Sequence, residues 1–255
     1  MQNRLLALAL LLTTFSFSQG FQKLSPKETG IDFVNTIIED DTINGLSYLY
    51  LYNGGGVAVG DINNDGLEDI YFTGNQVDDK LYLNQGDLKF KDVTKKYFKN
   101  QRFDFHTGVT MLDINNDGWL DIYVSCAGPD YDGENRRNKL FINQEGKRFV
   151  DQAKEYGLDD SLNTTQAAFF DADGDGDLDC YLLNHVYNRQ NTQYAYQFNK
   201  AKKVHGNDKL LMQIEGKFVD KTKESNIHST GYGLGVSITD INSDGHPDIY
   251  VTNDF

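Results

Sequence analysis

The chain has 255 residues, a formal net charge of −14 and two cysteines. This length suits one or two ordinary domains, and the acidic balance argues against non-specific binding to nucleic acid or anionic membrane. Cys126 and Cys180 are too few for a disulfide framework. We expect two buried free thiols, with a disulfide between neighbouring repeats as the alternative.

Residues 1–18 have the pattern of a secretory signal peptide. Arg4 gives a cationic start, an apolar run covers residues 5–12, and Ser16 and Ser18 stand at the −3 and −1 positions of a cut after residue 18. The run is shorter than the ~20 apolar residues of a membrane span. No cysteine near the cut would carry a lipid anchor, and no later segment is apolar enough to span a bilayer. We therefore expect a secreted, periplasmic or cell-surface protein without a membrane span.

Residues 19–52 form an N-terminal segment, and the repeats occupy residues 53–255. An acidic loop recurs four times, at 61–69, 113–121, 171–179 and 240–248, and the loops hold 15 of the 38 acidic residues. Short apolar runs precede each loop (56–60, 108–112, 166–170 and 235–239) and follow it (69–72, 121–124, 179–182 and 248–251). Third runs start at Lys80, Lys139 and Lys209, and fourth runs at Phe90, Phe149 and Phe218 after glycine-containing turns. Each repeat thus predicts four antiparallel strands, which is one blade of a β-propeller.

The predicted fold is all-β, a β-propeller of four-stranded antiparallel blades. The chain stops after the second strand of the fourth repeat, so we expect about four blades, the last incomplete, in the N-terminal portion of an incomplete ring. Residues 21–31 echo residues 149–158, and we expect them to supply a ring-closing fourth strand. The connection from the second to the third strand varies most, since the step from the last loop aspartate to the lysine of the third run is 11, 18 or 30 residues. Such variation marks one face of a repeat protein, often the binding face.

The acidic loops predict calcium sites, because oxygen donors alternate around a turn that glycine at position 6 permits. Four Ca²⁺ would be held by positions 1, 3, 5, 7 (through the carbonyl) and 9: Asp61, Asn63, Asp65, Leu67 and Asp69; Asp113, Asn115, Asp117, Trp119 and Asp121; Asp171, Asp173, Asp175, Asp177 and Asp179; Asp240, Asn242, Asp244, His246 and Asp248. An EF-hand is excluded because position 12 is apolar in every copy. Turns without metal are the alternative, although their carboxylates would repel one another. Asp173 adds a charge to the third loop, which we expect to bind tightest.

This pattern over residues 53–255 resembles the FG-GAP/VCBS repeat family of calcium-binding β-propellers, related to the integrin α propeller. Residues 235–255 look like repeats of ASPIC/UnbV-type, cartilage-acidic-protein-like proteins. The resemblance implies a secreted or surface binding scaffold with structural calcium. The third repeat departs from the pattern, with Gln166 in place of the lead-in glycine and Ala172 in place of isoleucine.

No catalytic motif or cofactor fingerprint is present, so no catalytic residue is predicted. Aromatic, amide and arginine side chains gather in the variable connections and predict contacts with an extracellular protein or carbohydrate: Tyr131, Arg136, Tyr187, Arg189, Tyr194 and Tyr196. Packing over a neighbouring blade is the alternative. The leading function is an adhesion-type protein- or glycan-binding module. The alternatives are the propeller part of a polysaccharide-degrading enzyme, such as a lyase, and a structural spacer. The oligomeric state is not predicted.

Overall fold

The computed structural model describes residues 20–99, 105–129, 136–186, 208–229 and 231–254. Fourteen strands form three four-stranded antiparallel sheets and one two-stranded sheet within these ranges. Their strand orders are β1-β2-β3-β4, β5-β6-β7-β8, β9-β10-β11-β12 and β13-β14. We name these sheets blades 1 to 4, since the order is that of propeller blades. The predicted fold class is confirmed.

The strands lie where the repeat predicts them. The first strand of each blade is β1 (Val57–Gly60), β5 (His106–Leu112), β9 (Asn163–Phe170) or β13 (Gly233–Thr239). The second is β2 (Asp69–Phe72), β6 (Asp121–Cys126), β10 (Asp179–His185) or β14 (Asp248–Asn253). The third is β3 (Lys80–Asn84), β7 (Lys139–Asn143) or β11 (Lys209–Ile214), and the fourth is β4 (Phe90–Asp92), β8 (Phe149–Asp151) or β12 (Lys217–Asp220).

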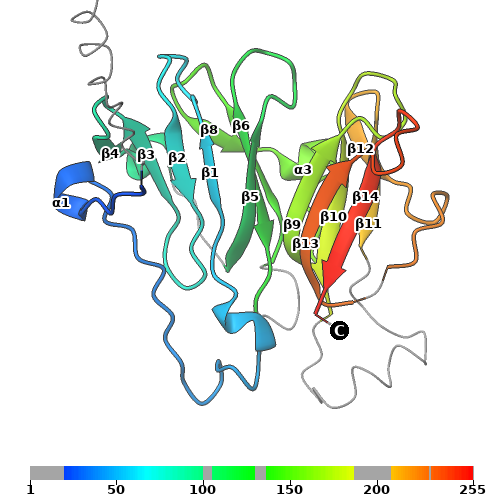
Figure 1. Ribbon diagram of the computed structural model, residues 1–255, viewed down its shortest axis with the longest axis horizontal. Helices are drawn as coiled ribbons and strands as arrows, with labels where there is room; N and C mark the ends of the chain where they lie inside the picture. The colour runs from blue at the N-terminus through cyan, green and yellow to red at the C-terminus, as the bar shows by residue number, and fades with distance from the viewer. Residues whose placement is uncertain (1–19, 100–104, 130–135, 187–207, 230, 255) are drawn as a thin grey trace, which may run out of the picture.

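Each acidic loop closes the hairpin between the first and second strands. Its last aspartate pairs with the last residue of the first strand in all four blades: Gly60 with Asp69, Leu112 with Asp121, Phe170 with Asp179 and Thr239 with Asp248. In Figure 1 these hairpins lie at the upper ends of the strands, and the connection from β2 to β3 lies at the lower end. The acidic loops and the variable connections therefore lie at opposite ends of the blades.

The apolar cores lie between neighbouring blades. Alternate residues of a strand face opposite sides of its sheet. Tyr123 of β6 accordingly packs with Leu182 of blade 3, whereas Ile122 and Val124 pack with Tyr71 of blade 1. A further cluster joins blades 3 and 4. The second strands of blades 2 and 3 are thus covered on both faces, and every residue of β6 and β10 is buried.

Glycine at the lead-in position lets the first strands of adjacent blades approach closely. A Cβ on Gly108 would lie 2.6 Å from the carbonyl oxygen of Thr165, and one on Gly56 would lie 2.7 Å from that of Thr107. In blade 3 the corresponding residue is Gln166, whose side-chain oxygen accepts a hydrogen bond from the Val236 amide of blade 4 at 3.4 Å. Blade 3 therefore has the same strand arrangement as blades 1 and 2, although Gln166 replaces the lead-in glycine.

Two short helices follow fourth strands, α2 (Thr94–Tyr97) after β4 and α3 (Ala153–Tyr156) after β8, and a third, α1 (Pro26–Thr29), precedes the first blade. Left-handed glycines end α1 and α3, Gly30 at φ 81° and Gly157 at φ 80°. Gly30 lies against the Phe90 carbonyl of blade 1 as Gly157 lies against the Phe218 carbonyl of blade 3. The segment ending at Gly30 thus occupies, beside blade 1, the place that the end of blade 2 occupies beside blade 3.

Residues 20–25 are not in a strand. The ring-closing strand therefore stays a prediction, as do the domain boundaries. The signal peptide falls outside the described residues. Among those described, no helix is long and apolar enough to cross a membrane. Both cysteines are free and buried, as expected.

Candidate metal-binding loops

The first aspartate of each acidic loop organises the turn. In the second loop, the Asp113 carboxylate accepts the backbone N–H groups of Asp117 at 3.0 Å and Gly118 at 2.8 Å. Gly118 has φ 85°, a left-handed conformation that glycine adopts without strain. The first and fourth loops repeat these bonds. Position 1 and the glycine at position 6 therefore fix the curl that brings the oxygen donors inward.

The last aspartate of the loop connects it to the sheet. The buried Asp121 carboxylate accepts the N–H of Ile114 in its own loop at 3.2 Å and that of Asn143 on β7 at 2.7 Å. Asp69 and Asp179 make the equivalent bonds in blades 1 and 3. Desolvation raises the pKa of Asp121 to about 7, against the lowering effect of these hydrogen bonds. Burial thus favours the neutral form of the Asp121 carboxyl group, whereas a nearby cation would favour its charged form.

Asparagine at position 3 changes the interior of three loops. The side-chain amide of Asn115 donates to the Asp117 carboxylate at 3.0 Å, and Asn63 and Asn242 do the same in the first and fourth loops. An amide hydrogen bond thus replaces one contact between like charges. In these three loops, the side chains at positions 3 and 5 therefore hydrogen-bond to each other.

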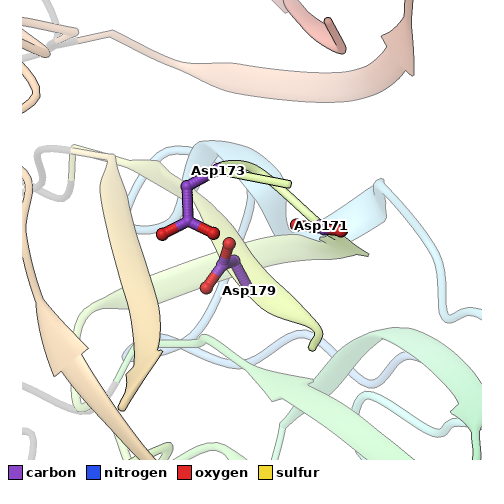
Figure 2. A group of neighbouring side chains, drawn as sticks. All are labelled: Asp171, Asp173 and Asp179. Atoms are coloured by element: carbon purple, nitrogen blue, oxygen red, sulfur yellow. The ribbon is translucent and has the colours of Figure 1, made fainter. Parts of the chain in front are cut away.

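The third loop gathers carboxylates instead. One oxygen each of Asp171, Asp173 and Asp179 lies within 4.8 Å of the others, and Figure 2 shows Asp173 and Asp179 pointing toward one another. The Asp175 carboxylate instead accepts the N–H of Asp177 at 3.0 Å. Oδ1 of Asp177 is buried without a hydrogen-bond partner in the part of the chain that the structure describes. The donor set is all oxygen and strongly anionic, which fits a hard divalent cation such as Ca²⁺ rather than a metal that selects nitrogen or sulfur.

The predicted ligand-binding residues fall mostly outside the described ranges. Tyr131, Tyr187, Arg189, Tyr194 and Tyr196 are among the residues that the structure does not describe. Arg136 is described, and its Nε donates to the carbonyl of Ser161 at 3.1 Å. This contact ties the base of its loop to the segment that leads into β9.

A second structural element, which the sequence analysis did not predict, recurs at the base of the variable connection in blades 1 to 3. The tyrosine of the second strand bonds to the aspartate or asparagine just before the third strand: Tyr71 to Asp79 at 2.6 Å, Tyr123 to Asn138 at 2.9 Å and Tyr181 to Asp208 at 2.8 Å. The second carboxylate oxygen of Asp79 or Asp208, or the amide oxygen of Asn138, accepts a backbone N–H near the end of the second strand, from Gly74, Asn184 or Cys126 respectively. We call this pair the Tyr–Asx clamp. Its signal in the sequence is an Asp or Asn before each Lys that starts a third strand.

One buried cluster resembles a nucleophile–base–acid arrangement. The His106 imidazole bonds to Asp79 at 2.7 Å, and Cys126 lies close enough to influence its pKa. All three side chains are at most 1% exposed, so no substrate reaches them. The cluster joins blades 1 and 2, and its burial indicates a structural role.

Comparison with known proteins agrees with the repeat pattern. Residues 61–124 match the model of the FG-GAP-like repeat. Cartilage acidic protein 1 of Xenopus tropicalis is 27% identical over 230 residues, which cover 89% of this chain and 33% of that protein. The human protein of that name is 27% identical over 206 residues, covering 79% of this chain and 28% of that protein. Integrin alpha-8 of Gallus gallus is 35% identical over 105 residues, covering 36% of this chain and 10% of that protein.

The chain therefore spans about a third of the length of the cartilage acidic proteins that it matches. The matched model covers the first two acidic loops and the strands between them, and the structure repeats the same hairpin in blades 3 and 4. The resemblance drawn from the four loops is confirmed, and residues 61–124 carry an FG-GAP-like repeat.

Proposed function

We propose that this protein is an extracellular, calcium-stabilised propeller module of the adhesion type, which binds a protein or glycan partner. The observation that carries the calcium part is the third loop, where three carboxylates converge within 4.8 Å. Such a group of like charges is unfavourable without a cation. The FG-GAP-like repeat and the relation to an integrin alpha chain support the adhesion-type role.

Calcium would act through the position-9 aspartates. Asp171, Asp173 and Asp179 would hold one ion in blade 3, and the equivalent positions would hold one in each other blade. Because Asp121 also accepts a hydrogen bond from β7, an ion at its loop would stiffen the connection between three strands of the blade. The role of the metal is structural, coupling ion binding to folding.

Calorimetric titration of metal-free protein with Ca²⁺ tests this role, together with melting curves in Ca²⁺, Mg²⁺ and EDTA. We expect Ca²⁺ to raise the melting temperature, because it binds the folded state only. Asp173→Asn should weaken the tightest site toward the affinity of the other loops, whereas Asp41→Asn changes the charge equally at an exposed position outside the loops. Equal melting temperatures in Ca²⁺ and EDTA would contradict the proposal.

The partner-binding part rests on the variable connections, of which the longest contains residues 187–207. The Tyr181–Asp208 clamp holds the two ends of that connection together. Deletion of residues 187–205 should therefore leave the melting temperature nearly unchanged while removing partner binding. A deletion variant that folds and still binds its partner would show that the partner site lies elsewhere.

Export would follow from the N-terminal 18 residues. Expression with its natural N-terminus, followed by sequencing of the exported protein, should show a new N-terminus at residue 19. Retention of the intact leader inside the cell would refute an extracellular location.

A further inference from the structure

The acidic loops of blades 1 and 2 are joined directly by an exposed side chain. The side-chain amide of Asn64, at position 4 of the first loop, donates to the carbonyl of Gly118 in the second loop at 3.0 Å. Asn64 has φ 56°, in the left-handed region that asparagine adopts more readily than most residues. The Gly118 carbonyl belongs to the peptide whose N–H, that of Trp119, donates to the Asp117 carboxylate at 2.9 Å. Asn64 thus holds a peptide that in turn holds a predicted ligand of the second loop.

A second connection between the two loops runs through Asn143 on β7, which is 1% exposed. Its side-chain amide donates to the carbonyl of Ile62 in the first loop at 2.8 Å and to that of Leu120 in the second loop at 3.0 Å. Its backbone N–H donates to Asp121, at position 9 of the second loop, at 2.7 Å. The N–H of Ile62 donates to Asp69, at position 9 of the first loop, at 3.1 Å. Asn143 and Ile62 therefore link the last aspartates of both loops through hydrogen bonds.

The turn between β7 and β8 packs against both loops. A Cβ on Gly146 would lie 2.7 Å from the Trp119 ring and 3.4 Å from the Cα of Asn63. These neighbours are position 7 of the second loop and position 3 of the first. The Gly146 N–H donates to the side-chain oxygen of Asn143 at 2.8 Å. The two loops and this turn therefore form one packed and hydrogen-bonded unit.

The loops of blades 2 and 3 lack these connections. Gln213 takes the place of Asn143 in blade 3, since each pairs with the phenylalanine of the following strand. The Gln213 N–H keeps the bond to Asp179 at 2.8 Å, but among the described residues no hydrogen bond joins its side chain to the second loop. Asn116, at position 4 of the second loop, likewise has none to the third loop in the ranges that the structure describes. The two asparagine connections thus distinguish the loops of blades 1 and 2.

We propose that Asn64 and Asn143 couple the loops of blades 1 and 2, so that calcium in one loop raises the affinity of the other, while the third loop binds independently. The proposal rests on the calcium role proposed above, and both loops carry the same oxygen donors at positions 1, 3, 5 and 9. An ion that orders the first loop also orders the two asparagines, so the second ion has less conformational entropy to remove. Repulsion between the two ions acts in the opposite sense, but salt screens it at exposed loops.

The test is a calcium titration at about 0.15 M salt, where repulsion between exposed charges is screened. Occupancy of the second loop is read by the fluorescence of Trp119, the single tryptophan, and both loops are read by the amide resonances of Gly66 and Gly118. Asp65→Ala removes a predicted ligand of the first loop. It should raise the calcium concentration that half-fills the second loop at least about fivefold, the lower end of typical coupling between sites. Asp173→Ala in the third loop should shift this concentration less than about twofold.

The same comparison in asparagine variants tests the two connections. Asn64→Gly keeps the left-handed backbone, as Gly174 does at this position of the third loop, and Asn143→Gln introduces the residue of blade 3. In the double variant, Asp65→Ala should shift the second loop less than about twofold, and in Asn64→Gly alone, a change at an exposed position, the shift should be at least about halved. Asn116→Gly is the matched control, because Asn116 has the same φ of 56°. The full shift should remain in that background.

A shift that the asparagine variants remove and Asn116→Gly preserves supports the coupling. A shift below about twofold after Asp65→Ala, an equal shift after Asp173→Ala, or a shift that survives in the double variant overturns it. Failure of the calcium role is distinguishable from these results. Loops that bind no calcium overturn both proposals, whereas loops that bind calcium independently of one another refute the coupling alone.

Discussion

Replacement of Asp208 tests the Tyr–Asx clamp directly. The carboxylate is 2% exposed and accepts the Tyr181 hydroxyl at 2.8 Å and the Asn184 N–H at 2.7 Å. Asp208→Ala leaves both donors buried without this acceptor. Hydrogen bonds to a charged group contribute ~1.5–3 kcal/mol each, so the free energy of unfolding should fall by ~3–5 kcal/mol. Such a loss is a large share of the ~5–15 kcal/mol of a typical domain.

Asp208→Asn is the matched variant, because blade 2 has an asparagine at this place. There the Asn138 side chain accepts the Cys126 N–H at 2.8 Å and donates to the Tyr123 hydroxyl at 2.9 Å. An amide therefore satisfies the clamp. Burial raises the pKa of Asp208, so the amide also removes the cost of a buried charge. We expect a change of no more than ~1 kcal/mol in the free energy of unfolding.

Guanidinium unfolding followed by circular dichroism and by the fluorescence of Trp119 measures both variants. Asp41→Ala, which removes an exposed carboxylate, is the control for the loss of one charge. Equal losses for Asp208→Ala and Asp208→Asn would refute the reasoning, because the hydrogen bonds would then not set the stability. A negligible loss for Asp208→Ala would do so as well.

Three further predictions concern packing and protonation. Gly108→Ala should lower the free energy of unfolding by ~1–3 kcal/mol, because its Cβ would lie 2.6 Å from a carbonyl oxygen of blade 3. Gly235→Ala is the control and should change the free energy of unfolding little in the same assay, because the nearest atom to its Cβ would be a side-chain atom at 3.3 Å. Burial lowers the pKa of His185 to about 3, so below pH ~6.5 the unfolded chain binds a proton that the folded protein does not. The free energy of unfolding should therefore fall by a few kcal/mol between pH ~6.5 and ~3, and His185→Gln should flatten this dependence. Parallel pH profiles of the two proteins would count against this explanation. Cys126 and Cys180 are buried, so Ellman's reagent should label neither in the native protein and both after unfolding; rapid native labelling would contradict the burial.

The blade could be predicted from the sequence because its signals are local. The first and last aspartates of each loop, the glycine between them and the alternating strand after them all lie within a dozen residues. The lead-in glycines were also visible, but not their reason, which is contact with Thr107 or Thr165 of the next blade. The Tyr–Asx clamp joins Tyr181 to a residue 27 positions later, and that separation differs between blades. Spacing alone does not reveal such a pair.

The candidate site could likewise be predicted only in part from the sequence. The roles of position 1 and position 9 follow from the motif, although the bond from Asp121 to β7 needs the folded sheet. The contacts of His185 could not be predicted, since Tyr48, Thr165 and His185 belong to three different parts of the chain.

The apolar clusters between the blades have a consequence for how the molecule opens. A sheet whose tyrosine and leucine side chains are completed by the next sheet has little stability alone, so the blades behave as a row of units coupled to their nearest neighbours. Every residue of β6 and β10 is buried, whereas no residue of β14 is fully buried. Amide hydrogen exchange should therefore be slower in β6 and β10 than in β14.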